Sequence, residues 1–134
     1  MPIIAFNFTR INAERHEQKA GPMNIKNNVV LKDAIKTKLA LGAQSQDVLR
    51  VTFEFMSSYE PHRGHITLEG ELIYLEKPEK IDSIAKAWQK DKKLPKDEAR
   101  IAINHILGKC NVEAIIISRE ANLPAPIELP SIAK

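Results

Sequence analysis

The spacing of apolar side chains changes once along this chain, from a two-residue period in the first half to a helical period in the second. Residues 3–11 contain an alternation of apolar side chains with small or polar ones, and its apolar members are Ile4, Phe6 and Phe8. Such alternation is typical of a strand with one buried face. The same pattern is clearest in residues 49–55, where the apolar members are Leu49, Val51, Phe53 and Phe55. Two strands are therefore predicted here.

Two further strands are expected, with polar loops at 42–47 and 57–64. Residues 24–41 fit a strand or a helix, and we favour the strand because apolar residues keep alternating with lysines to the end of the segment. Residues 65–75 should pair with the preceding strand as a hairpin. Gly70 interrupts their apolar row, which predicts a bulge, a bend or the close approach of another backbone.

Beyond residue 77 the apolar residues recur at helical spacing. Ile81, Ile84 and Trp88 predict a short helix over about residues 79–91. A second helix is expected from about Pro95, because proline is tolerated in a first turn and the acidic residues that follow favour the positive end of a helix.

The second helix keeps an apolar side to about Ala121. Gly108 and Asn111 could break or bend it, so one helix and two helices both fit. Residues 123–130 are too rich in proline for a helix and predict an extended tail. The order predicts an α+β fold, in which a four-stranded antiparallel sheet carries two or three helices on one face of a single domain spanning residues 1–134.

The composition fits one cytoplasmic domain. With 134 residues, 43% of them hydrophobic, the chain can bury one core. Its single cysteine, Cys110, excludes an intramolecular disulfide and fits a reducing compartment. No run approaches the roughly 18 to 20 apolar residues of a membrane span, and residues 1–10 lack the features of a secretory signal. We therefore expect no membrane association.

A modest positive charge is spread unevenly. The formal net charge of +3 permits contact with RNA without requiring it. Five lysines crowd the first helix and the loop after it, and Asp91 and Asp97 dilute them: Lys86, Lys90, Lys92, Lys93 and Lys96. This basic patch could hold phosphate, although a solvated face is the simpler explanation.

No catalytic, cofactor or metal site is predicted. His62 and His65 have a spacing that metals use, beside Glu60, but no cysteine or second histidine pair completes a site, so a solvated turn is favoured. His105 fits a core or interface position better than a general base, and Cys110 fits a packed thiol. Neither a GxxxxGK[ST] loop nor a GxGxxG turn occurs. We therefore expect a non-enzymatic protein with no cofactor and no small-molecule substrate.

Over most of its length the chain resembles the SecB-like proteins, including the small archaeal members of that fold. The resemblance rests on an apolar helix with a leucine and a cysteine, an Arg-Glu pair and a proline-containing segment, preceded by four strands. The matching positions are Ile106, Leu107, Cys110, Arg119, Glu120, Pro124 and Pro126. It implies a four-stranded antiparallel sheet whose edge strands pair across a subunit boundary, homodimers that pair again into tetramers, and clients held in apolar grooves between sheet and helix.

The chain departs from this family in its charge. The bacterial export chaperones are strongly acidic, whereas this protein is basic. An export role is therefore in doubt, and a basic surface on the same scaffold would favour ribosome or RNA.

We predict a homo-oligomeric, chaperone-type module that engages unfolded or partner polypeptide. Its contact residues would be apolar, with ordinary core as the competing explanation for each: Phe6, Phe8, Phe53, Phe55, Trp88, Ile127 and Leu129. The alternative is a ribosome-associated factor whose dimer binds small-subunit protein or rRNA and bridges or blocks ribosomal subunits, thereby silencing translation.

Overall fold

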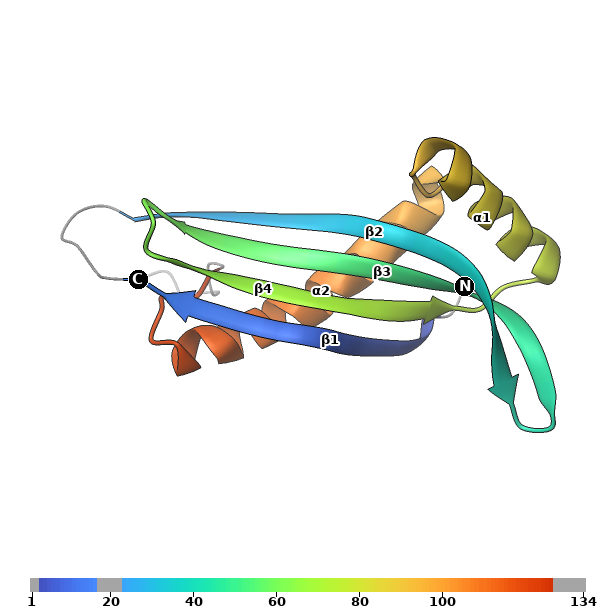
Figure 1. The fold of residues 1–134 in the computed structure, drawn as a ribbon, viewed down its shortest axis with the longest axis horizontal. Coiled ribbons are helices and arrows are strands. Elements are labelled where there is room, and N and C mark those ends of the chain that lie inside the picture. The colour runs from blue at the N-terminus through green and yellow to red at the C-terminus, as the bar shows by residue number, and fades with distance from the viewer. Residues whose placement is uncertain (1–2, 17–22, 127–134) are drawn as a thin grey trace, which may run out of the picture.

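The described part of the chain folds as four strands followed by two helices. The computed structural model describes residues 3–16 and 23–126. The elements are β1 (Ile3–Arg15), β2 (Asn24–Leu41), β3 (Gln44–Glu60), β4 (Gly64–Tyr74), α1 (Pro78–Asp91) and α2 (Lys96–Glu120). Figure 1 shows both helices on the same face of the sheet. The predicted α+β fold is confirmed, with two helices in place of the two or three that the sequence allowed.

The strands form one antiparallel sheet in the order β1-β4-β3-β2, so β1 and β2 are its edges. The predicted hairpin of β3 and β4 is confirmed. The two polar loops are shorter than expected. Most of 42–47 and 57–64 extends the strands, because the polar residues of β3 pair with β2 from Gln44 to Glu60. Gly42, with a φ of 67°, makes the tight turn between those strands.

The β2–β3 ribbon is longer than the rest of the sheet. β4 pairs with β3 only from Leu49 to Tyr59, whereas β2 continues to pair with β3 as far as Gln44. Residues 37–48 therefore form a two-stranded ribbon that projects beyond β4 (Figure 1).

The core lies between the sheet and the helices, on the alternating apolar positions of β3 and β4. Phe53, Phe55, Leu68 and Leu72 are all buried there. The alternation proposed for β1 needs one correction. Ile4 is 38% exposed, and Ile3 packs on the core in its place, because the pairing register shifts between Ile3 and Ala5.

Gly70 allows β1 to lie close to β4. A Cβ atom at this position would collide with the carbonyl oxygen of Asn7 and with the ring of Phe53. The register of β1 also shifts beside it, between Phe8 and Arg10. The predicted bulge and close approach are confirmed.

The two helices bury different kinds of side chain. α1 packs against β2 and β3 with Ile81, Ile84 and Trp88. α2 packs against β4 and is one continuous helix. The exposed Gly108 does not break it, because the free energy that glycine costs a helix is smaller than the free energy that packing on the sheet contributes. Its buried residues recur every four positions: Ala102, Ile106, Cys110, Ala114 and Ser118.

By length and composition alone, α2 would also be able to cross a bilayer. A helix at the core of a globular domain meets the same criteria, so one such helix is weak evidence for a membrane span. The buried stripe of α2 packs on the sheet, as the stripe of a core helix does.

The segment after α2 returns to the sheet. The hydroxyl group of Tyr59 donates to the carbonyl oxygen of Pro124 at 2.5 Å, and Asn27 Nδ2 donates to the carbonyl oxygen of Pro126 at 2.9 Å. These bonds fix residues 123–126 against β2 and β3. The rest of the expected tail, with Ile127 and Leu129, lies outside the residues that the structure describes.

Candidate functional site

A groove runs between the edge strand β1 and helix α2. Its lining residues are Phe8, Asn104, His105, Gly108, Lys109, Val112 and Glu113, and its volume is about 590 Å³. We call it the β1–α2 groove. A second hollow of about 470 Å³, lined by Ile3 and Ile101, shares Asn104 and His105 with it. The two hollows therefore follow the same seam between strand and helix.

Aromatic rings form the base of the groove. Phe6 lies edge-on to Phe8, with ring centroids 5.2 Å apart, and stacks on the buried Phe53 at the same distance. The ring of His105 lies 5.5 Å from that of Phe6. Aromatic pairs in such arrangements contribute roughly 0.5–1.5 kcal/mol beyond the area they bury. The base of the groove is thus an apolar surface continuous with the core.

His105 contributes a neutral wall to the groove. Burial, and then the positive charge of Lys109, lower the pKa of this imidazole from its ordinary value of 6.5. The side chain is therefore uncharged near neutral pH and suits an apolar ligand. Lys109 and Glu113 supply one charge of each sign among the lining residues.

Exposed apolar side chains border the groove. On α2, Val112 is 59% exposed, Ile116 47% and Ile101 37%, and Ile11 on β1 is 45% exposed. β1 is also an edge strand, so its outer backbone groups have no neighbouring strand in the described part of the chain. Such an edge can accept an extended peptide as an additional strand.

The predicted contact residues fall into three groups. Phe53, Phe55 and Trp88 are at most 4% exposed, so they belong to the core and present no surface to a partner in this chain. Phe6 and Phe8 are partly buried; Phe8 lines the groove, and Phe6 packs against Phe8 beside it. The remaining two, Ile127 and Leu129, are not described.

Sequence reasoning missed the α2 residues of the groove. The sequence pattern identifies Ile101, Val112 and Ile116 only as apolar residues of a predicted helix. One signal in the sequence could have found them. α2 contains more large apolar residues than a single buried stripe can accommodate, which indicates that some of them are exposed.

The five lysines of the basic patch are all exposed, but they do not line a common groove. Lys86 and Lys92 border a hollow of about 450 Å³ between β2 and α1, which also contains Asp33 and Asp82. Lys36 forms an ion pair with Asp82 there at 2.7 Å. This hollow therefore has mixed charge.

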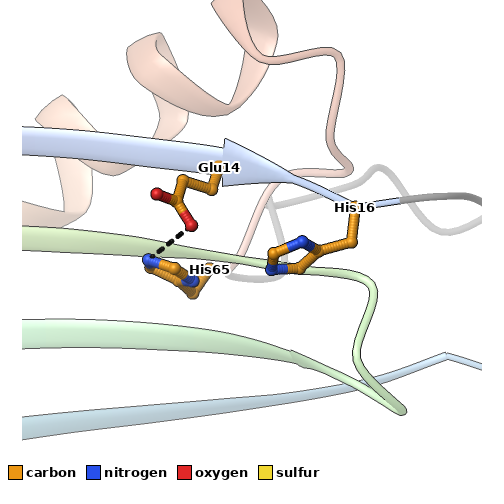
Figure 2. A group of neighbouring side chains, drawn as sticks. All are labelled: Glu14, His16 and His65. Carbon is orange, nitrogen blue, oxygen red and sulfur yellow. Dashed lines mark ion pairs between the residues drawn. The ribbon is translucent and has the colours of Figure 1, made fainter.

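A separate cluster of polar side chains lies at the end of the sheet where β1 and β4 meet. Glu14, His16 and His65 converge there, and Glu14 Oε2 lies 3.6 Å from His65 Nε2 (Figure 2). The ring of His62 stacks on that of His16 with centroids 4.5 Å apart. The sequence drew attention to His62 and His65, but Glu14 and His16 come from a distant segment that only the pairing of β1 with β4 brings close.

The other face of the sheet has a different character. Lys32 binds Glu54 at 3.2 Å and Glu69 at 2.9 Å, and its hydrogen bond lowers the pKa of Glu69. These contacts are exposed, so they add little stability. They mark a hydrated surface, in contrast to the apolar groove beside α2.

No family model matches the sequence, and no curated protein matches it significantly. A solved structure is similar: the SecB-like chaperone Rv1957 of Mycobacterium tuberculosis, in complex with a ChAD peptide from the HigA1 antitoxin Rv1956. The TM-score is 0.52 at 10% sequence identity, and the match covers 99% of this chain and 91% of that one. At this identity the likeness concerns the fold. The four-stranded antiparallel sheet followed by two helices is therefore a SecB-like fold, as the sequence resemblance predicted.

Proposed function

We propose that this protein is a cytoplasmic, non-enzymatic, homo-oligomeric module of the chaperone type, which binds apolar segments of polypeptide in the β1–α2 groove. The observation that carries the proposal is the exposed apolar surface of α2 beside a base of packed aromatic rings. The similar Mycobacterium tuberculosis chaperone was solved with a peptide bound, which supports a peptide ligand for the same fold.

The groove offers an extended peptide two kinds of contact. The free edge of β1 can pair with the peptide backbone, and apolar side chains of the peptide can cover Phe8 and Val112. Burial of apolar surface contributes roughly 25 cal/mol per Å² to the binding free energy, largely regardless of the sequence of the peptide. A ligand recognised in this way needs apolar residues rather than one exact sequence.

A binding role without catalysis is supported by the chemistry near the groove. Cys110 is fully buried, and burial raises the pKa of its thiol to about 12. A thiol of that kind is a poor nucleophile. His105 faces Phe6. In the described part of the chain, neither residue is hydrogen-bonded to a neighbour that could complete a pair of nucleophile and base.

Self-association is the second component of the proposal. Val112 and Ile116 are exposed neighbours on one face of α2, and an exposed apolar patch can mark a surface that binds another protein. A second copy that covered this face would compete with a client, so assembly and client binding need separate measurements.

The test is suppression of aggregation. We expect the protein to suppress light scattering by a chemically denatured client, and Val112→Asp to lose most of this effect because a charge in the groove disfavours apolar ligands. Ser83→Asp places the same charge on the exposed surface of α1, outside the hollows described above, and serves as the matched control.

Light scattering coupled to size-exclusion chromatography would give the mass of each variant. Wild-type protein without effect at several-fold excess over the client would contradict the proposal. An unchanged effect in Val112→Asp would contradict the assignment to this groove. A monomeric wild type that still binds client would remove the homo-oligomer and keep the binding function.

Ribosome association is the second candidate function, favoured by the exposure of all five lysines of the basic patch. It has less support, because acidic side chains are interleaved with these lysines. Phosphate contacts weaken steeply with salt, whereas apolar contacts do not. Co-sedimentation with ribosomal subunits at low salt that is lost at high salt would favour this candidate.

A further inference from the structure

We propose that Glu14, His16 and His65 form a binding site for zinc or a chemically similar divalent transition metal, at the end of the sheet where β1 and β4 meet (Figure 2). One ligand atom from each of the three side chains lies within 4.8 Å of the other two. Two imidazole nitrogens and a carboxylate oxygen are a donor set that zinc commonly uses.

The distances are close to those of a metal site. In a tetrahedral zinc site, with bonds of about 2.0–2.1 Å, neighbouring ligand atoms lie roughly 3.3 Å apart. Glu14 Oε2 and His65 Nε2 are 3.6 Å apart, so this pair already spans about one edge of the tetrahedron. The side chain of Glu14 is 54% exposed and can adjust by rotation. Metal binding would therefore draw the three ligand atoms together from separations of at most 4.8 Å.

The backbone holds the three ligands together. Glu14 and His65 are direct partners in the register of β1 and β4. The backbone N–H of His16 donates to the carbonyl oxygen of Arg63 at 2.9 Å, which fixes the chain just beyond β1. Gly64 has a φ of 151°, and a Cβ atom there would collide with the carbonyl oxygen of Glu14. Glycine thus permits the close approach that sets Glu14 beside His65.

The surroundings favour a metal over a simple ion pair. An ion pair needs only Glu14 and His65, yet three of the four histidines in the chain gather here. His62 adopts a left-handed backbone conformation, with a φ of 51°, and its ring lies nearly parallel to that of His16. The ring of His62 thus packs against one of the three proposed ligands. The amide nitrogen of Asn12 lies 3.5 Å from the same His65 Nε2 that faces Glu14, so a bound metal would replace this contact.

The donor set indicates which cations would bind. Imidazole suits zinc, nickel, cobalt and copper, whereas magnesium and calcium prefer oxygen ligands. Three protein ligands leave one position of a tetrahedron open to water. The site would link the edge strand β1 to β4 on the face of the sheet opposite the core, since Ala13 and Ile66 point to the core.

Calorimetric titration of untagged, metal-free protein with zinc near neutral pH tests the proposal. We expect one zinc ion per chain, and His16→Ala and His65→Ala should each weaken zinc affinity by at least about tenfold because each removes one of three ligands. His105→Ala removes the one histidine outside the cluster and should leave zinc affinity unchanged. Magnesium at the same concentration should not bind.

Two further measurements separate loss of a ligand from loss of the fold. Glu14→Gln keeps the size of an exposed side chain and should still weaken zinc affinity, while circular dichroism shows the same fold. Cobalt bound to wild type should give the absorption bands of a tetrahedral complex, and the three ligand variants should not. Absence of stoichiometric zinc binding in wild type, or equal binding by wild type and all three ligand variants, would overturn the proposal and leave Glu14 and His65 as an ion pair.

Discussion

The two helices cover the same face of the sheet in opposite ways. α1, with 14 residues, turns its bulky Ile81, Ile84 and Trp88 into the core. α2, with 25 residues, buries mainly small side chains and leaves Val112 and Ile116 exposed. Small residues at a contact allow a helix to lie close to a sheet. Large buried side chains therefore anchor α1 in the core, whereas the large side chains Val112 and Ile116 of α2 are exposed on the surface.

The largest expected effect concerns the anchor. Trp88→Ala should destabilise the protein by about 3–5 kcal/mol, because it opens a cavity in the core and removes the hydrogen bond from Trp88 Nε1 to Asp33 at 3.1 Å. Urea unfolding followed by circular dichroism measures the change. A loss below about 1 kcal/mol would show that α1 does not anchor the core.

A smaller effect tests how closely α2 lies to the sheet. Ala114 is fully buried, so Ala114→Leu should cost about 1–3 kcal/mol through overpacking. Ala87→Leu on the partly exposed side of α1 is the matched control and should change stability little. If Ala114→Leu were as stable as wild type, the contact between α2 and the sheet would be looser than the structure shows.

Gly108 offers a stabilising change on α2. It is exposed, and a Cβ atom there would meet nothing within 4 Å. Gly108→Ala should therefore stabilise the protein by about 1 kcal/mol through helix propensity. The same methyl group lines the β1–α2 groove, so aggregation suppression tested in parallel would show whether the groove tolerates a smaller opening.

The smallest expected effect is a pH dependence on α2. Burial, and then Lys109, lower the pKa of His105 below 6.5, so the unfolded chain takes up this proton more readily than the folded one. The stability of the folded state is then unaffected above pH 6.5 and falls as the pH drops below it.

Thermal melting of wild type and His105→Gln over this pH range isolates the histidine, because other groups titrate in both proteins. We expect wild type to lose more stability than the variant as the pH falls. A constant difference between the two melting temperatures would contradict the lowered pKa.

Much of the fold could be predicted because alternation is a direct record of burial. Residues 49–55 and 65–75 have the buried faces that their apolar positions predict. The ends of the strands were harder, since the polar residues of 42–47 pair with β2 in spite of their composition. Whether Gly108 breaks α2 depends on a propensity cost of about 1 kcal/mol, which tertiary packing exceeds.

The candidate site was less accessible to sequence reasoning. Alternation places Phe8 and Phe53 on one face of the sheet, but it does not show that one lies at a groove and the other beneath it. That distinction depends on where α2 crosses the sheet. The partners of His65 depend likewise on the register of β1 with β4, which the chain does not encode in any local motif.

The projecting ribbon of β2 and β3 divides the sheet into parts that should open independently. Between Gln44 and Val48, β3 pairs with β2 alone, and this pairing ends at Leu41 and Gln44. A two-stranded ribbon is marginally stable by itself. Amide hydrogens near its tip should therefore exchange with solvent through local fraying. Those of central β3 should exchange only when the whole domain unfolds.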